Sequence, residues 1–126
     1  KCAAPGRPVV CFTGDGAFYY HVGELETARR LGMPLVVVVN NNAGFGQGLY
    51  RVRAMQGDRP GNPDALLCHG PTDFAAVARA FGCEGIRVED PADVAPAIER
   101  ALAMQAPVVV DVATSMESRA PDAWSP

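Results

Sequence analysis

Two continuous apolar runs constrain the fold of this chain more than any other feature. They cover residues 8–13 (PVVCFT) and 35–39 (LVVVV), and neither alternates between apolar and polar residues. Such runs are typical of strands whose two faces are both buried, as in a parallel sheet between layers of helices. Both runs are therefore expected to form buried strands.

The stretch between the two runs has the spacing of an amphipathic helix. Apolar residues recur at every third position from Val22 to Leu31, and Gly32 follows as a helix-ending glycine. A strand, a helix and a strand within about thirty residues form a βαβ unit, in which a right-handed crossover makes the two strands parallel.

The same alternation continues in the second half of the chain. The spacing of apolar residues from Phe74 to Phe81 predicts a helix, with Thr72 as its N-cap and Gly82 at its end. Three further elements are expected: a strand at 86–88, a helix that begins at Asp90-Pro91 and buries Val94, Ile98 and Leu102, and a strand at 107–112.

Residues 43–71 separate the two halves and are rich in glycine. A loop of this length is uncommon in a compact domain unless it serves a function or contains a short helix, which is expected at 47–55. Together, the elements predict an α/β fold with an open parallel sheet and helices on both faces.

Composition and charge restrict the possible partners. With 126 residues, 48% of them hydrophobic, the chain has the length and apolar content of one domain. Its formal net charge of −3 and the lack of a Lys/Arg cluster argue against binding to nucleic acid. No segment approaches the roughly 18 apolar residues of a membrane span, and no signal peptide is visible.

The cysteines and the chain start give two further expectations. The four cysteines have neither a C-x-x-C spacing nor a histidine at zinc-ligand spacing, so free thiols in a reducing cytoplasm are expected. The chain begins with Lys1-Cys2 and has no initial methionine, and we expect it to be a fragment of a longer protein.

Polar residues follow both strands of the βαβ unit at the point where each strand ends. A Gly-Asp-Gly turn occupies residues 14–16, and three asparagines occupy residues 40–42. Because the carboxyl ends of parallel strands share one edge of the sheet, Asp15 and the asparagines are expected to converge there. A carboxylate, an amide and backbone carbonyls are hard oxygen ligands, which suit Mg²⁺ or Ca²⁺ rather than zinc.

The residue types at this edge predict an anionic ligand. A single carboxylate supplies little charge, and Mg²⁺ usually completes its coordination with water and phosphates. Gly14 and Gly16 allow phosphate oxygens to approach the backbone, so the predicted ligand is a metal-bound diphosphate. A dinucleotide is disfavoured, because Tyr19 stands where the third glycine of G-x-G-x-x-G would be. Each motif alone also has a structural interpretation, as a common turn or a strand-end asparagine.

The two motifs together resemble a family signature. Gly14-Asp15-Gly16 followed by Asn41-Asn42 is similar to the thiamine diphosphate signature, in which GDG and NN are roughly 25 to 30 residues apart and joined by one βαβ unit. The resemblance extends to Phe18, Glu24-Leu25, Thr27-Ala28, Gly32, Pro34, Gly44-Phe45-Gly46 and residues 73–82 and 109–112. The chain looks like the C-terminal thiamine diphosphate-binding domain of the acetohydroxyacid synthase and 2-oxoacid decarboxylase family. Residues 1–114 would then be this domain, without its upstream part, and residues 115–126 a tail.

The resemblance implies roles for individual residues. Asp15, Asn42 and the backbone carbonyl of Gly44 resemble the family's Mg²⁺ ligands. The other residues that it assigns to the cofactor are Gly14, Gly16, Ala17 and Phe18, which would line the diphosphate, and Asn41, Phe45 and Gly46. Asn41 would either contact phosphate or hold the loop. Asn40 stands where the family usually has an apolar residue, and it is expected to be only a strand-end residue.

The chemistry that the resemblance implies belongs to the cofactor. The thiazolium ylide attacks the 2-carbonyl of an oxo acid, carbon dioxide leaves, and the remaining acyl-anion equivalent is transferred to a second carbonyl or protonated. The activating glutamate of the family lies on another domain of a partner subunit. No catalytic residue is therefore expected in this chain, which alone should be inactive. Glu24 is not a substitute, because its position fits the first turn of a helix.

One segment departs from the family pattern. Synthases typically continue with Met-Val-Arg-Gln-Trp after the Tyr/Phe-Gly step, whereas this chain has QGLYR at residues 47–51. Because this segment shapes the substrate pocket of the family, two activities stay open: an acetolactate synthase-like carboligase, and a non-oxidative 2-oxoacid decarboxylase of the benzoylformate or indolepyruvate type. A non-catalytic nucleotide-phosphate-binding module is the alternative from another class.

The histidines and the assembly complete the expectations. His21 either flanks a helix or faces the site, and His69, in the glycine-rich loop, is either solvated or contacts substrate. The resemblance implies a small 2-oxo acid as substrate and a homodimer or homotetramer, because the cofactor of this family lies between domains of two chains.

Overall fold

A computed structural model of the protein describes residues 1–118. They contain a four-stranded sheet in the order β1-β2-β4-β3, and every pair of neighbouring strands is parallel. The strands are β1 (Val10–Gly14), β2 (Val36–Asn41), β3 (Glu84–Val88) and β4 (Val108–Ala113). The predicted open parallel sheet is confirmed.

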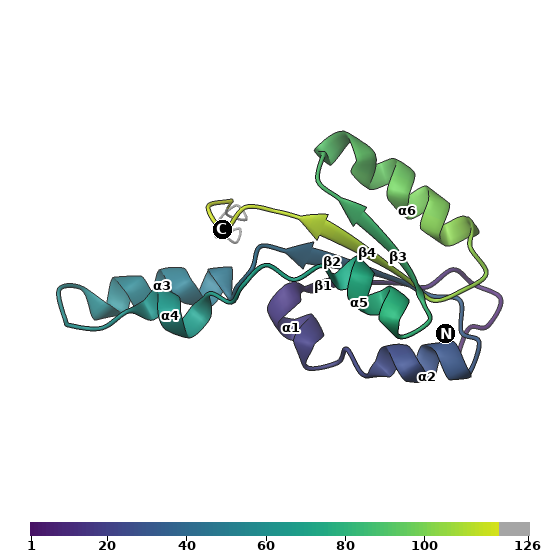
Figure 1. Ribbon diagram of the computed structural model, residues 1–126, viewed down its shortest axis with the longest axis horizontal. Helices are drawn as coiled ribbons and strands as arrows, with labels where there is room; N and C mark the ends of the chain where they lie inside the picture. The colour runs from purple at the N-terminus through teal and green to yellow at the C-terminus, as the bar shows by residue number, and fades with distance from the viewer. Residues whose placement is uncertain (119–126) are drawn as a thin grey trace, which may run out of the picture.

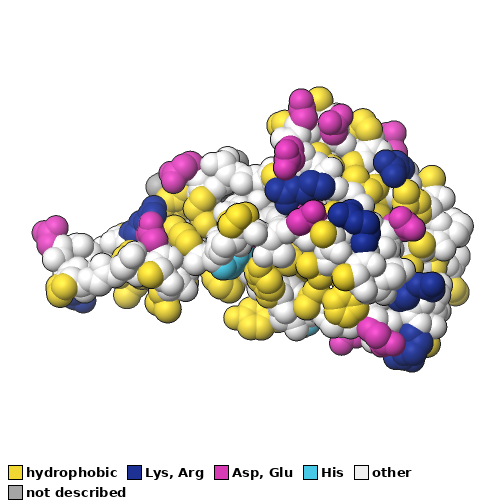
Figure 2. Space-filling model, in the orientation of Figure 1, with side chains coloured by type: hydrophobic (Ala, Val, Ile, Leu, Met, Phe, Trp, Pro, Cys, Tyr) yellow, Lys and Arg dark blue, Asp and Glu magenta, His cyan; other side chains and the backbone are white. Residues whose placement is uncertain are grey.

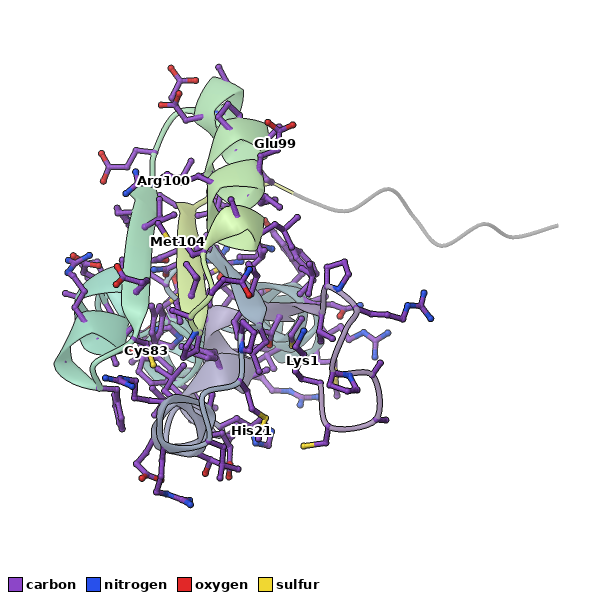
Figure 3. The ribbon with its side chains drawn as sticks, turned by 90° about the vertical axis from the view of Figure 1, so that its right-hand side faces the viewer. Lys1, His21, Cys83, Glu99, Arg100 and Met104 are labelled. Carbon is purple, nitrogen blue, oxygen red and sulfur yellow. The ribbon has the colours of Figure 1, made fainter. Side chains whose placement is uncertain are left out.

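Helices lie on both faces of this sheet (Figure 1). One face is covered by α1 (Asp15–Tyr19), α2 (Glu24–Arg30) and α5 (Phe74–Ala80), and the other by α6 (Val94–Ala103). Figure 3 shows α6, with Glu99, Arg100 and Met104, on one side of the sheet, and His21 beside α2 on the other. The helices on both faces are therefore also as predicted.

The valines of β2 explain why its sequence does not alternate. Val37 and Val39 belong to the core that contains Phe74, and Val36 and Val38 belong to the core beneath α6. All four are buried. Burying one such side chain stabilises a fold by roughly 1.5–3 kcal/mol, so both layers of helices depend on this central strand.

β1 differs from the prediction of a strand buried on both faces. It lies at the edge of the sheet, and Val10 and Phe12 have exposed fractions of 48% and 73%. The reason is topological, because within residues 1–118 only β2 pairs with this strand.

The helix ends combine correct and incorrect predictions. Gly32 and Gly82 have φ values of 57° and 76° and end α2 and α5 in the left-handed conformation, as predicted. Asp90 caps the short 3-10 turn η1 (Pro91–Asp93) before α6, by accepting a hydrogen bond from Ala92 N–H. The predicted N-cap Thr72 is wrong, because the Asp73 carboxylate caps α5 through Ala76 N–H.

Two predicted helical faces need correction as well. The crossover contains the additional helix α1, and Leu31 lies just beyond α2 with an exposed fraction of 54%. Val94 and Ile98 pack against the core under α6, whereas Leu102 has an exposed fraction of 40%. The predicted spacing extended each apolar face one residue too far.

Residues 43–71 contain two helices, α3 (Gly46–Gln56) and α4 (Pro63–Leu67), where one was predicted. They lie side by side in an arm that projects from the sheet domain (Figure 1). The Arg53 guanidinium donates hydrogen bonds of 2.9 and 2.6 Å to the Asp64 carboxylate and joins the two helices. This hydrogen bond lowers the pKa of Asp64 below its ordinary value.

The distribution of surface charge and the state of the cysteines agree with the expectations from the sequence. Figure 2 shows basic and acidic side chains interspersed over α5, β3 and α6, without a patch of one sign on that face. All four cysteines are free, and burial raises the pKa of the Cys83 thiol. Within residues 1–118, no helix has the length and apolar character to cross a bilayer. Residues 119–126 of the predicted tail lie outside the described residues.

Candidate functional site

The Gly-Asp-Gly turn and the asparagines meet at the carboxyl edge of the sheet. Gly14, at the end of β1, lies opposite Asn40 of β2. Asp15 Oδ2 and Asn42 Oδ1 both accept a hydrogen bond from the Gly44 N–H, at 3.1 and 3.2 Å. The carboxylate and the amide oxygen therefore lie close together, although a whole βαβ unit separates them in sequence.

Asp15 is a buried carboxylate, with an exposed fraction of only 1%. Its Oδ1 accepts a hydrogen bond of 2.7 Å from Gly16 N–H, and its Oδ2 accepts the one from Gly44. Backbone N–H groups favour an anion but carry no net charge, and a buried carboxylate is stable only when it is paired or bound to a metal. A bound cation at this position would supply the missing charge.

The loop between Asn42 and Gly44 is strained. Ala43 has a φ of 61°, in the left-handed region that residues with a Cβ rarely adopt. Two backbone hydrogen bonds of 2.9 Å hold this loop, from His69 N–H to Ala43 O and from Phe45 N–H to Leu67 O. Strain of this kind is often found at functional sites, where the surrounding structure enforces it.

The glycines of the site do not all leave open space. Among residues 1–118, a Cβ at Gly14 would have no neighbour within 4 Å, and contact of its backbone with phosphate stays a prediction. A Cβ at Gly16 would lie 2.5 Å from the Phe45 ring, so glycine allows this ring to pack against the turn, and contact of Gly16 with phosphate stays a prediction. At Gly46 a Cβ would lie 2.9 Å from Asn42 Nδ2, so glycine allows α3 to begin against the amide.

Three predicted cofactor residues lie around this centre in different settings. Ala17 is exposed on α1. Phe18 packs edge to face on Phe74 with ring centroids 5.3 Å apart, so only its main chain is left for a ligand. Asn41 Nδ2 donates hydrogen bonds of 2.8 Å to Thr72 O and to Asp111 Oδ1, which favours the loop-holding role. Contact of these residues with the cofactor stays a prediction.

Asp111 was missed by the sequence analysis, although it joins three segments at this edge. It is fully buried and accepts hydrogen bonds from Asn41, from Phe74 N–H at 2.8 Å and from Arg87 Nη1 at 2.6 Å. Burial lowers the pKa of Arg87, but the hydrogen bond and charge of Asp111 outweigh it and the pKa is raised. A single charged residue inside the valine run of β4 was the available signal.

The two histidines differ in position. His69 is brought to the site, with Nε2 3.9 Å from Asp15 Oδ2. His21 is exposed and lines a separate cleft with Cys11 and Leu25, between β1 and α2. No periodicity marks His69 in the sequence, because a long loop positions it.

The donor set suits a hard cation. Among residues 1–118, no group of three or more His, Cys, Asp or Glu side chains could hold a metal. One carboxylate, one amide oxygen and a backbone carbonyl are instead ligands that suit Mg²⁺, which takes its remaining ligands from water and phosphate. Asp15, Asn42 and Gly44 therefore fit the predicted metal–diphosphate group.

Comparisons with known proteins agree with this geometry. Residues 1–112 match the family described as thiamine pyrophosphate enzyme, C-terminal TPP binding domain. The chain is 35% identical over 108 residues to an acetolactate synthase of Bacillus subtilis, covering 86% of this chain and 18% of that protein. It is 37% identical over 123 residues to a glyoxylate carboligase of Escherichia coli O157:H7, covering 88% and 21%.

A solved structure has the same fold. The thiamine diphosphate-dependent 4-hydroxybenzoylformate decarboxylase of Rhodococcus jostii RHA1 matches with a TM-score of 0.78 at 30% identity, over 90% of this chain and 21% of that chain. The chain thus spans 18% to 21% of the length of these three proteins. The sheet, the convergence of Asp15 with Asn42 and the match over residues 1–112 show that the chain belongs to the C-terminal thiamine diphosphate-binding domain family of acetolactate synthase-like and decarboxylase enzymes.

Proposed function

We propose that this domain binds thiamine diphosphate through Mg²⁺, in an enzyme that decarboxylates a 2-oxo acid and transfers the resulting acyl-anion equivalent. The observation that carries the proposal is the position of Asp15 Oδ2 and Asn42 Oδ1, which share the Gly44 N–H at the edge of the sheet. The bound cofactor supplies the carbanion chemistry through its thiazolium ring. This chain supplies the anchor.

The anchor consists of three groups, one at the start of α1 and two on the loop between β2 and α3. Asp15 contributes one negative charge, so a divalent cation bound to it keeps a positive charge that a diphosphate neutralises. The Asn42 amide oxygen and the Gly44 carbonyl complete the protein's share of the coordination. Asp15 follows β1 directly, and Asn42 and Gly44 follow the buried strand β2, so the sheet fixes the diphosphate in space and the reactive ring with it.

Calorimetry of the complete protein tests the anchor. We expect thiamine diphosphate to bind only when Mg²⁺ is present, and the substitutions Asp15→Ala and Asn42→Ala each to weaken binding at least tenfold, the effect of losing one charged contact. Binding that persists in excess EDTA, or that neither substitution changes, contradicts the proposal. A non-catalytic nucleotide-phosphate-binding module would instead bind a nucleoside diphosphate and show no turnover.

The reaction class rests on the relatives. Acetolactate synthase and glyoxylate carboligase favour carboligation. The decarboxylase match and the QGLYR segment at the start of α3 favour the alternative, a non-oxidative 2-oxoacid decarboxylase. Incubation of the complete protein with pyruvate separates the two, because a carboligase releases acetolactate and a decarboxylase releases free aldehyde.

The proposed enzyme is a cytoplasmic homodimer or homotetramer, with its activating glutamate on another domain. Val10 and Phe12 of β1 are apolar and exposed, which supports the proposal that another protein surface packs against this strand. Light scattering of the complete protein measures its oligomeric state. A monomer that retains turnover contradicts the proposed dimer or tetramer.

A further inference from the structure

We propose that His69 is a positioning residue for the diphosphate: its imidazole donates a hydrogen bond to an oxygen of the metal–diphosphate group that Asp15 and Asn42 hold. This inference rests on the proposed function of the site. It starts from two buried nitrogen atoms that have no hydrogen-bond partner among the described residues and lie beside the carboxylate proposed to bind the metal.

The nitrogen atoms of His69 are in an unusual environment. Within residues 1–118, Nδ1 and Nε2 are both buried and neither has a hydrogen-bond partner, while the side chain as a whole has an exposed fraction of 24%. Nearly all buried polar atoms in proteins are hydrogen-bonded, and each exception requires an explanation. A neutral imidazole has one donor and one acceptor, and a bound ligand oxygen would provide a partner for the donor.

The position of His69 is fixed from two directions. Its ring lies edge-on to the rings of Tyr19 and Phe45, with centroids 5.0 and 6.0 Å away and interplanar angles of 89° and 90°. Its backbone N–H donates to Ala43 O at 2.9 Å, in the loop that carries Asn42. The imidazole is therefore held in a defined orientation before any ligand binds, and loses little freedom when it binds one.

The distance to Asp15 shows which part of the cofactor His69 would contact. At 3.9 Å, Nε2 and Asp15 Oδ2 are too far apart for a direct hydrogen bond. A diphosphate oxygen bound to the cation that Asp15 is proposed to hold could accept a hydrogen bond from Nε2. Asp15 is the proposed metal ligand, and the metal binds the diphosphate. His69 is therefore expected to affect cofactor affinity, and not the recognition of the 2-oxo acid.

The alternative is that His69 only fills space between Tyr19 and Phe45. The substitution His69→Phe keeps an aromatic ring there but removes the donor, whereas His69→Gln retains a donor. His21→Phe serves as the matched control, because the second histidine is exposed in a separate cleft.

The test is calorimetry of the complete protein with Mg²⁺ and either thiamine diphosphate or inorganic pyrophosphate. For His69→Phe we expect the Kd of both ligands to rise about tenfold to a hundredfold, the range for a hydrogen bond to a charged group. His69→Gln should recover part of this loss, and His21→Phe should bind like the wild type. Inorganic pyrophosphate has no ring system, so an equal effect on both ligands assigns the contact to the diphosphate.

The outcomes separate this inference from the proposed function. If the wild-type protein binds neither ligand, the proposed function itself is wrong. If the wild type binds and His69→Phe binds equally well, or only the KM of the oxo acid changes, the role of His69 is refuted. If His69→Phe also lowers the Tm of the ligand-free protein, the His69→Gln variant distinguishes the two roles. A variant with the wild-type Tm but weak ligand binding refutes the positioning role of His69. A variant that regains both the Tm and the affinity supports it.

Discussion

At the scale of single residues, Gly44 carries more of the site's contacts than its size suggests. Its N–H is shared by Asp15 and Asn42, and it forms an isolated antiparallel bridge with Cys68. A Cβ at this position would lie 2.7 Å from Leu67 O, which is a backbone atom and unable to rotate away. Only glycine allows the loop at residues 42–45 and residues 67–69 to approach this closely.

The substitution Gly44→Ala should therefore separate these two segments. We expect Mg²⁺-dependent binding of thiamine diphosphate to weaken more than tenfold, because the shared N–H and the carbonyl of residue 44 both move. Isothermal calorimetry measures the effect. Gly70→Ala is the control in the same loop, since a Cβ there would meet none of the described residues within 4 Å. Equal affinities of the two variants would show that the close approach is not needed.

Ala43 permits a second prediction at this scale. Its φ of 61° is strained for any residue with a Cβ, and a β-branched side chain tolerates it least. Ala43→Val should lower the free energy of unfolding by about 1–3 kcal/mol, whereas Ala43→Gly should change it by less than about 1 kcal/mol. Urea unfolding of the complete protein distinguishes these values, and a neutral Ala43→Val would mean that the loop adopts another conformation.

At the scale of secondary-structure elements, the packing of β3 on α5 depends on one glycine. A Cβ at Gly85 would overlap the backbone carbonyl of Ala75 in α5. The close contact brings α5 onto the sheet, so that Phe74 enters the core and its N–H reaches Asp111. Through this contact, the packing of β3 affects the edge of the sheet where Asp111 and Asn41 lie.

Gly85→Ala should thus destabilise the protein by about 1–3 kcal/mol, the usual cost of overpacking. Gly6→Ala is the matched control, because no residue in the described range 1–118 lies within 4 Å of a Cβ added at Gly6. Denaturant titration of both variants measures the difference. If the two midpoints coincide, β3 and α5 are not rigidly packed.

The α3–α4 arm gives a prediction about pH. The hydrogen bond from Arg53 lowers the pKa of Asp64 from its ordinary value of 3.8. Because the pKa of Asp64 is lower in the folded protein, the Arg53–Asp64 pair stabilises the arm at pH values above 3.8. This stabilisation is lost as the pH falls through the folded-state pKa. Cleavage between α3 and α4 by an acid-tolerant protease should therefore accelerate in that range. The Asp64→Asn variant should be cleaved quickly at every pH. If its cleavage rate instead depends on pH as in the wild type, the Arg53–Asp64 pair is not the cause of the pH dependence.

At the scale of the whole molecule, the described part of the chain leaves one edge strand of its sheet uncovered. β1 leaves its outer edge and the Phe12 ring open, although this strand carries the Gly-Asp-Gly turn at its end. An apolar side chain exposed to this degree on an unpaired edge strand is a liability unless another protein surface covers it. We therefore expect another protein surface to cover β1 in the complete protein and to help fix the position of Asp15, which follows this strand directly.

Phe12→Ala in the complete protein tests this. If Phe12 is covered there, we expect a loss of about 3–5 kcal/mol, the range for a buried phenylalanine, together with weaker cofactor binding through displacement of Asp15. Differential scanning calorimetry and a cofactor titration provide the two readouts. A neutral substitution would show that β1 remains a solvent-exposed edge in the complete protein.

Local chemistry determined the features that the sequence predicted correctly. The valine run of residues 36–39 forms an inner strand, and Gly32 and Gly82 end helices, because each of these features depends on neighbours within a few residues. The convergence of Asp15 and Asn42 was also predictable, since a right-handed βαβ crossover fixes both strand ends at one edge.

The remaining features depend on contacts between distant parts of the chain. The exposure of β1, the Asp111–Arg87 pair and the Phe45 ring over Gly16 are all decided by which segments become neighbours. His69 is the clearest case: a bridge between Gly44 and Cys68 brings it beside Asp15, and no local pattern encodes that pairing. The sequence by itself determined the parallel βαβ unit and the edge where Asp15 and Asn42 meet, because periodicity and turn chemistry are local. Only the tertiary structure decided which loop residues complete the site, because long-range packing selects them.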